Sequence, residues 1–242
     1  MAVALHAGHE LSPQLAALMR LGDDERRREE DPYTGYWTTV GDHALVVDRS
    51  RFELDLNRSR SQCIYVEPSQ AWNLEPWTSP PPPPVVERSQ RMHDRFHALA
   101  EALITDVVVR HGWFVVLDLH SYNHRRDGPE APPADPVDNP EINLGTESID
   151  MGRWGHLVDA FADGLRRRPI RERALDVRDN VRFRGGHFPR WVNHHFGHLG
   201  CAIAVEVKKF FMDEWTGAVD WSLIGDIRSL FGAAVRAMVE QR

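Results

Sequence analysis

A chain of 242 residues is long enough for one large α/β domain or two small ones, and its content of 42% hydrophobic and 27% charged residues is that of an ordinary globular protein. The formal net charge of −7 argues against a nucleic-acid partner, and two distant cysteines argue against a disulfide scaffold or a cysteine-rich zinc site. Because no stretch resembles a signal peptide or a membrane span, we expect a cytoplasmic protein with no membrane partner.

The first part of the chain predicts short elements. An apolar stretch over residues 2–5 ends at His6, and Ser12 followed by Pro13 is a typical start for a helix that extends to about residue 20. Pro32 favours an extended backbone at Asp31, which closes an acidic cluster. Three short strands are predicted next, at residues 44–47, 51–56 and 63–66.

The rest of the chain alternates helices with buried strands. Five prolines at 80–84 predict a rigid polyproline II segment, either a spacer or an entry to the next helix, and that helix is predicted over 87–111. A strand over 113–119 comes directly after this helix, which is typical of parallel sheets. Residues 121–146 predict a long functional loop. The remaining predicted elements are a helix at 148–167, a tight turn at Gly185-Gly186, a short helix at 189–196, a buried strand at 202–207 and a closing helix at 215–241.

Polar side chains stand where four predicted strands end or approach their end. These are His6, the pair Asn57 and Arg58, His120, and Glu206 within an otherwise apolar run. Ligands of open α/β sheets bind beyond the carboxyl ends of the strands. Two imidazoles and a carboxylate are a common zinc set, and a further carboxylate can accept a proton from water. We therefore interpret Glu206 as a catalytic base.

Each of these residues also has a purely structural interpretation. Glu206 could be a buried acid paired with an arginine or with Lys208, and residues 55–58 could simply form a turn. Other histidines offer alternative metal sites. They are His93 with His97, four apart on a helix whose charged neighbours favour an exposed face, and the group His194, His195 and His198, which has no carboxylate beside it.

Seven motifs, taken in chain order, resemble those of the N-formylglutamate amidohydrolase family. The match that carries most weight is the string from Arg51 to Arg58, which is similar to the family's Ser-Arg-x-x-x-Asp-Leu-Asn-Arg, although the proline that often follows is missing. The motifs are His6-Ala-Gly, Glu29-Glu-Asp31, Arg51-Phe-Glu-Leu-Asp55-Leu-Asn57-Arg58, Asp118-Leu-His120-Ser121, Asn143-Leu-Gly-Thr146, Arg184-Gly-Gly186 with Arg190, and Ala204-Val-Glu206.

The resemblance implies the plan of zinc carboxypeptidases and aspartoacylases. We expect a single catalytic domain over residues 1–242, built as a three-layer α/β/α sandwich with a mostly parallel mixed sheet. By the same likeness His6 and His120 would bind Zn²⁺, or another divalent metal in its place. Asn57 and Arg58 would hold a substrate carboxylate, with Arg190 as a further candidate. Glu206 would activate water and pass its proton to the leaving amine.

The third metal ligand has several candidates. Carboxypeptidase-like enzymes place an acid three residues after the first histidine, where this chain has His9 and then Glu10. The acidic cluster offers Glu30 and Asp31 instead. We favour Asp31, because Pro32 fixes an extended backbone beside it and the family has an aspartate there.

Together these features predict a metal-dependent hydrolase that cleaves an N-acyl group, and N-formyl in particular, from an acidic amino acid such as glutamate. The expected partner is this small molecule, and a homo-oligomer is compatible with the sequence. Two alternatives stay open. One is a zinc carboxypeptidase or a different acylase of the same plan, and the other is a catalytically idle protein that binds a small acid.

Overall fold

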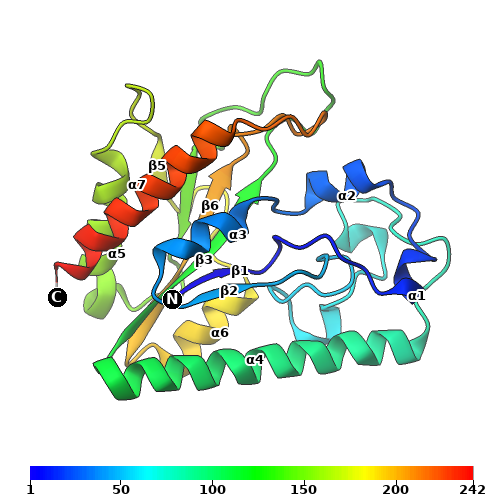
Figure 1. Ribbon diagram of the computed structural model, residues 1–242, viewed down its shortest axis with the longest axis horizontal. Helices are drawn as coiled ribbons and strands as arrows, with labels where there is room; N and C mark the ends of the chain where they lie inside the picture. The colour runs from blue at the N-terminus through cyan, green and yellow to red at the C-terminus, as the bar shows by residue number, and fades with distance from the viewer. Residues whose placement is uncertain (242) are drawn as a thin grey trace.

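The computed structural model describes residues 1–241 and has one mixed sheet between two layers of helices (Figure 1). The strand order is β2-β1-β3-β6-β4-β5, and every neighbouring pair is parallel except β4 with β6. The strands are β1 (Ala2–Ala4), β2 (Ala44–Val46), β3 (Phe114–Tyr122), β4 (Ile142–Gly145), β5 (Val177–Asp179) and β6 (Gly200–Lys208). The predicted α/β/α sandwich with a mostly parallel sheet is confirmed.

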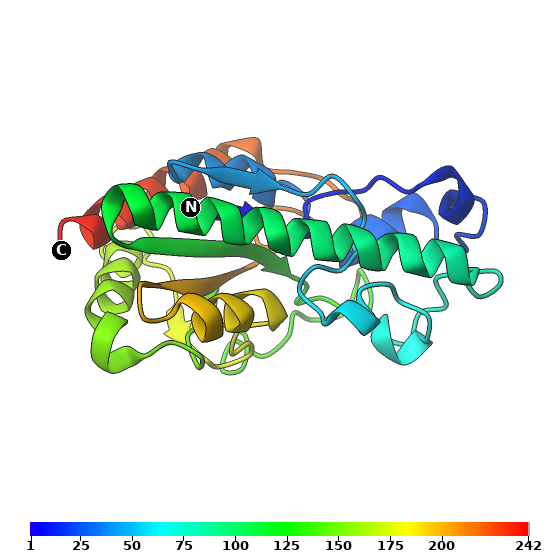
Figure 2. The same cartoon turned by 90° about the horizontal axis from the view of Figure 1, so that it is seen from below.

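The helices cover both faces of this sheet. One face packs against α4 (Pro83–His111) and α6 (His187–Phe196), which lie side by side in Figure 2. The other face packs against α3 (Thr34–Trp37), α5 (Met151–Arg166) and α7 (Trp221–Val239). The remaining helices are α1 (Pro13–Ala16), α2 (Asp23–Glu29) and the 3₁₀ turns η1 (Thr38–Val40), η2 (Arg60–Gln62) and η3 (Pro68–Gln70).

Two long central strands set the positions of the side chains that matter below. β3 and β6 are parallel and in register, so that His120 lies directly beside Glu206. Because side chains alternate along a strand, Leu117 and Leu119 pack in the core under α5 and α7, whereas Val116 packs under α4 and α6. His120 is four residues after Val116, so it projects on the α4 and α6 side, where the apolar core ends.

A third apolar cluster lies beyond the sheet. It is formed by α1, the segment 50–80 and the first turn of α4, with Phe52, Tyr65 and Trp77 at its centre. In Figure 1 these parts lie on the right, past the carboxyl end of β1. This cluster fixes the segment that carries residues 51–58 against the end of the sheet.

Several predicted boundaries are wrong for identifiable reasons. Residues 51–56 form buried turns instead of a strand, because Glu53 and Asp55 bind Ser12 N and His6 instead of facing solvent. Residues 63–66 are irregular, with Val66 exposed. The prolines at 83 and 84 start α4, since proline is well placed in the first turn of a helix. The loop predicted at 121–146 contains the end of β3 and all of β4. The closing helix starts at Trp221 instead of residue 215, because the Asp220 side chain caps it by accepting from Leu223 N.

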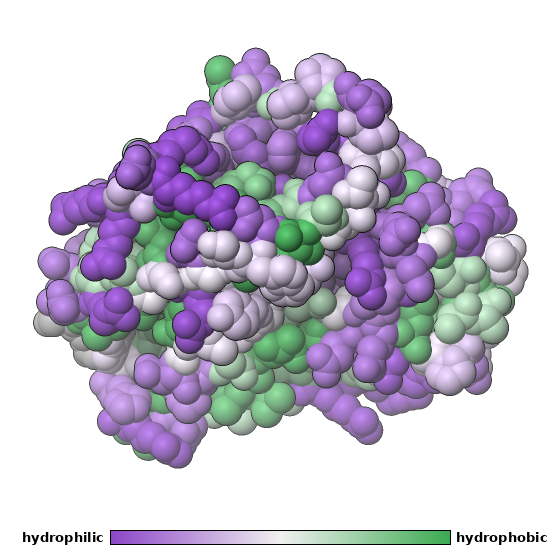
Figure 3. Space-filling model, turned by 45° about the horizontal axis from the view of Figure 1, so that its top comes forward, coloured by the Kyte–Doolittle hydropathy of each residue, from purple (hydrophilic) through white to green (hydrophobic). Residues whose placement is uncertain are grey.

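None of the helices within residues 1–241 combines the length and the apolar character needed to cross a membrane. On the face shown in Figure 3, hydrophilic residues cover the protruding parts, and apolar residues are exposed between them.

Candidate metal centre and active site

A cavity of about 420 Å³ lies at the carboxyl ends of the central strands, where ligands of open α/β sheets bind. His6, Asp31, Asn57, His120 and Glu206 all line it. They come from the ends of β1 and β3, from β6, and from the loops after α2 and before η2. The structure therefore brings together residues that are up to 200 positions apart in the chain.

His6, Asp31 and His120 form the core of this site. The Asp31 side chain lies between the two imidazoles, with its Oδ2 atom 2.9 Å from Nδ1 of His120 and 3.3 Å from Nδ1 of His6. Asp31 N donates to His6 O at 2.9 Å, which holds the loop after α2 beside the end of β1. All three side chains are buried, and their ligand atoms lie within 4.8 Å of one another.

The outer nitrogen of each imidazole meets another carboxylate. His6 Nε2 forms a hydrogen bond with Asp55 Oδ1 at 2.7 Å, whereas His120 Nε2 lies 3.0 Å from Asp118 Oδ2 without a hydrogen bond between them. A metal-binding histidine commonly gives its second N–H to a carboxylate, which fixes the ring and its tautomer. Nδ1 of His6 is buried and has no hydrogen-bond partner within residues 1–241. The donor set therefore fits a divalent cation bound by His6, Asp31 and His120.

The charges around the three ligands also favour a cation. Burial alone would raise the pKa of Asp31, but the hydrogen bond with His120 and the nearby imidazole of His6 hold it well below its usual range. Burial would likewise lower the pKa of His120, but the charges of Asp118 and Glu206 raise it well above its usual range. The site thus stabilises positive charge, which a proton or a metal ion can supply.

Glu206 lies beside this group and differs from the other acids. Burial raises its pKa to about 7, although the charge of His120 acts in the opposite direction. Its side chain is 9% exposed and lines the cavity. A carboxyl group with a pKa near neutrality can both accept and return a proton, as a general base requires.

The predicted substrate-binding residues are placed differently from one another. Asn57 lines the cavity, with Oδ1 accepting from Phe188 N at 2.9 Å and Nδ2 3.4 Å from His120 Nε2. Arg190 lines its rim and is half exposed, 3.3 Å from Glu147. Arg58 points away, since it donates to Gln70 O at 2.7 Å and lies over the Tyr65 ring. Their roles stay predictions.

Positively charged side chains around the cavity are more numerous than the sequence indicated. Lys209 is one of them, and its burial lowers the pKa of the ammonium group to about 8. Asp55 and Asp118 were also missed as partners of the histidines, although the Asp-x-His spacing on β3 predicts two side chains on one face. The arginines that line the cavity are Arg28, Arg51, Arg126, Arg182, Arg184 and Arg190.

The alternative ligands lie outside the three-residue group. His9 Nδ1 is 2.5 Å from Glu30 Oε2, and Ser50 Oγ donates to the other oxygen of Glu30. Glu10 is exposed. Within residues 1–241, His194, His195 and His198 do not converge as metal ligands, whereas His93 and His97 do so together with His187.

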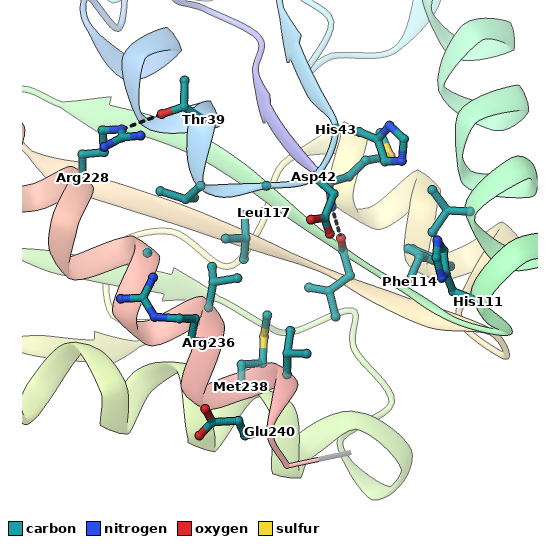
Figure 4. Close-up of a pocket in the computed structure, with 18 of the residues that line it drawn as sticks. Thr39, Asp42, His43, His111, Phe114, Leu117, Arg228, Arg236, Met238 and Glu240 are labelled. Carbon is teal, nitrogen blue, oxygen red and sulfur yellow. Dashed lines mark hydrogen bonds between the residues drawn. The ribbon is translucent and has the colours of Figure 1, made fainter.

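A larger cavity of about 920 Å³ lies at the opposite ends of the strands (Figure 4). Phe114, Arg228, Arg236 and the N-terminal residue line it, and the amino group of Met1 donates to Val115 O at 2.9 Å. Neither of the two ligand groups found within the described part of the chain lies there. The larger of the two cavities is therefore not the one that contains the candidate active site.

Comparison with known proteins places this geometry in context. A family model described as N-formylglutamate amidohydrolase matches residues 2–211. The structure of an N-formylglutamate amidohydrolase from Ralstonia eutropha JMP134 is similar, with a TM-score of 0.70 and 17% identity over 100% of this chain and 93% of that one. A gene product from Agrobacterium tumefaciens has a TM-score of 0.66 and 16% identity over 99% and 91% of the two chains. No curated protein sequence matches. At these identities the likeness to solved structures concerns the fold.

Proposed function

This chain belongs to the N-formylglutamate amidohydrolase family, and from that premise we propose that it is a metal-dependent hydrolase of N-acyl amino acids, with N-formylglutamate as its substrate. The observation that carries the proposal is the convergence of His6, Asp31 and His120 beside Glu206 in one cavity. Zn²⁺ is the metal we favour, because two imidazoles and one carboxylate are typical ligands of catalytic zinc. When bound, it would supply a Lewis acid that polarises the amide carbonyl.

Glu206 performs the proton transfers in this proposal. As a water oxygen bonds to the carbonyl carbon of the substrate, Glu206 accepts the proton that the water loses. It then delivers this proton to the amide nitrogen as the carbon–nitrogen bond breaks, releasing a carboxylic acid and a free amino acid. For an N-formyl substrate the acid is formate. In the metal-free protein, burial raises the pKa of Glu206 to about 7.

The charge of the cavity supports an acidic amino acid as the leaving group. N-Formylglutamate carries two carboxylates, and arginine binds a carboxylate through two parallel hydrogen bonds. Arg190 and Asn57 line the cavity and would hold them in this proposal. Arg58 would have to release Gln70 O before its guanidinium could take part. In the present arrangement Arg58 stabilises the negative charge of Asp55, because its Nε atom lies 3.4 Å from Asp55 Oδ2.

The test replaces Glu206 with Gln, which keeps the size of the side chain and removes the base. We expect turnover of N-formyl-L-glutamate to fall by a factor of about 10² or more, while the bound metal per chain stays that of the wild type. Glu101→Gln, on the exposed side of α4, serves as the matched control. Wild-type activity in Glu206→Gln would exclude this residue as the base.

A substrate panel then separates this proposal from its rivals. We expect N-formylglutamate and N-formylaspartate to be hydrolysed in preference to neutral N-acyl amino acids and to peptides. Preferential cleavage of peptides would favour a carboxypeptidase, and binding without turnover would favour an idle sensor. A cytoplasmic location and a homo-oligomer stay expectations of the same proposal.

A further inference from the structure

Three histidines outside the cavity form a second cluster. His93 and His97 lie on successive turns of α4, and His187 is the first residue of α6. Their ligand atoms lie within 4.8 Å of one another. The ring centroids are 4.1 Å apart for His93 and His97, and 5.9 and 6.1 Å apart for the pairs that include His187. The cluster joins two helices that cover the same face of the sheet.

In two of the three rings, one nitrogen lies within hydrogen-bond distance of a backbone carbonyl oxygen. His93 Nε2 lies 3.0 Å from Arg58 O, and His97 Nδ1 lies 3.0 Å from His93 O. Since only an N–H can donate to a carbonyl, the other nitrogen of each ring carries a lone pair. This arrangement orients a metal-binding histidine, because the outer N–H holds the ring while the inner nitrogen faces the ion.

Ring packing leaves one atom of the cluster unexplained. His97 packs edge-on against Trp191, with the centroids 4.8 Å apart, so its half-buried ring has an aromatic partner. Its Nε2 atom, however, is buried and has no hydrogen-bond partner within residues 1–241. A buried nitrogen without a partner is costly, and a cation would satisfy it.

The surroundings keep these imidazoles uncharged, which is the form that binds a metal. Burial lowers the pKa of His97 to about 4, and it also lowers the pKa values of His93 and His187. The nearby carboxylate of Asp94 is held by Arg60 at 2.8 Å. A donor set of three imidazoles favours a late first-row transition ion over Mg²⁺ or Ca²⁺.

We propose that His93, His97 and His187 form a second metal site, for Zn²⁺ or a similar transition ion, that fastens α4 to the start of α6. This site is separate from the group at His6. Its role is structural, because the same residues hold the loop that carries the substrate-binding pair. His93 contacts Arg58 O, and His187 N donates to Asn57 O at 3.1 Å.

The test counts zinc bound to the full-length protein after metal removal, titration with zinc and desalting. We expect two equivalents in the wild type and one in His97→Phe, a change that keeps a ring beside Trp191. His187→Asn should also bind one, whereas the control His194→Ala, on the exposed side of α6, should bind two. If His97→Phe and His187→Asn bind as much zinc as the wild type, the second site is excluded.

Melting temperatures test the second metal site independently of the site at His6. In a His6→Ala background, zinc at about a hundredfold excess over its dissociation constant should raise the melting temperature by about 5–10 °C. The same addition to the double variant His6→Ala with His97→Phe should leave the melting temperature unchanged. An equal rise in both proteins would contradict the proposal.

Discussion

Replacing Glu206 with Gln should stabilise the metal-free protein, and the gain should grow with pH. Burial raises the pKa of Glu206 from its ordinary value of 4.5 to about 7 in the folded protein. The folded state therefore holds the proton more tightly than the unfolded state does. The stability contributed by the protonated group is fully present below pH 4.5, and it is lost as the pH rises through about 7.

The size of this effect follows from the two pKa values. Their difference, 7 − 4.5, corresponds to about 3 kcal/mol at about 1.4 kcal/mol for each pKa unit. Glutamine does not titrate, so the variant does not lose this stability as the pH rises. Relative to the wild type, the variant should thus gain about 3 kcal/mol in the free energy of unfolding between pH 4 and pH 8.

Urea denaturation of both proteins in the presence of a chelator measures this difference. The contributions of titrating groups that do not interact with Glu206 cancel when the variant is compared with the wild type at each pH. Glu101→Gln, on the exposed side of α4, is the control. Its free energy of unfolding should differ from that of the wild type by nearly zero at both pH 4 and pH 8. A gain for Glu206→Gln that does not change between pH 4 and pH 8 would refute the assignment of a raised pKa.

Three further predictions concern the support of the site and the stability of the fold. Asp55→Asn should lower the affinity for zinc about 10- to 100-fold, because Asp55 fixes His6 through a 2.7 Å contact, and an unchanged affinity in a zinc titration would exclude this role. Gly225→Ala should raise the free energy of unfolding by about 0.5–1 kcal/mol, since the helix has open space there. Gly8→Ala should lower it by more than about 1 kcal/mol, because the new Cβ atom would lie 2.1 Å from the backbone of Asp48. Denaturation curves that rank these two variants in the opposite order would contradict the packing at both positions.

The sequence was sufficient to predict which side chains meet at the edge of the sheet. His120 and Glu206 interrupt long apolar runs, and such runs predict parallel strands that end at one edge of a sheet. Their register places the two side chains side by side. Asp31 could be favoured over its neighbours from the proline that follows it and from the family motif, and it is the acid that lies between the two imidazoles.

Other features depend on contacts that no local pattern contains. Residues 51–56 alternate apolar and polar side chains as a strand would, yet Glu53 and Asp55 are buried and bind Ser12 N and His6. β4 has only four residues, and its pairing with β6 involves a segment about 60 positions away. The role of His97 likewise emerges only when the fold brings His187 from another helix to α4.

The measurement that tests the account most directly follows the hydrolysis of N-formyl-L-glutamate, as release of formate and glutamate, before and after metal removal. We expect the metal-free protein to be inactive and the addition of zinc to restore activity. His120→Ala should stay inactive when zinc is added, because it lacks one of the three ligands. Hydrolysis at the wild-type rate by the metal-free protein, or full recovery in His120→Ala, would contradict a metal centre at His6, Asp31 and His120.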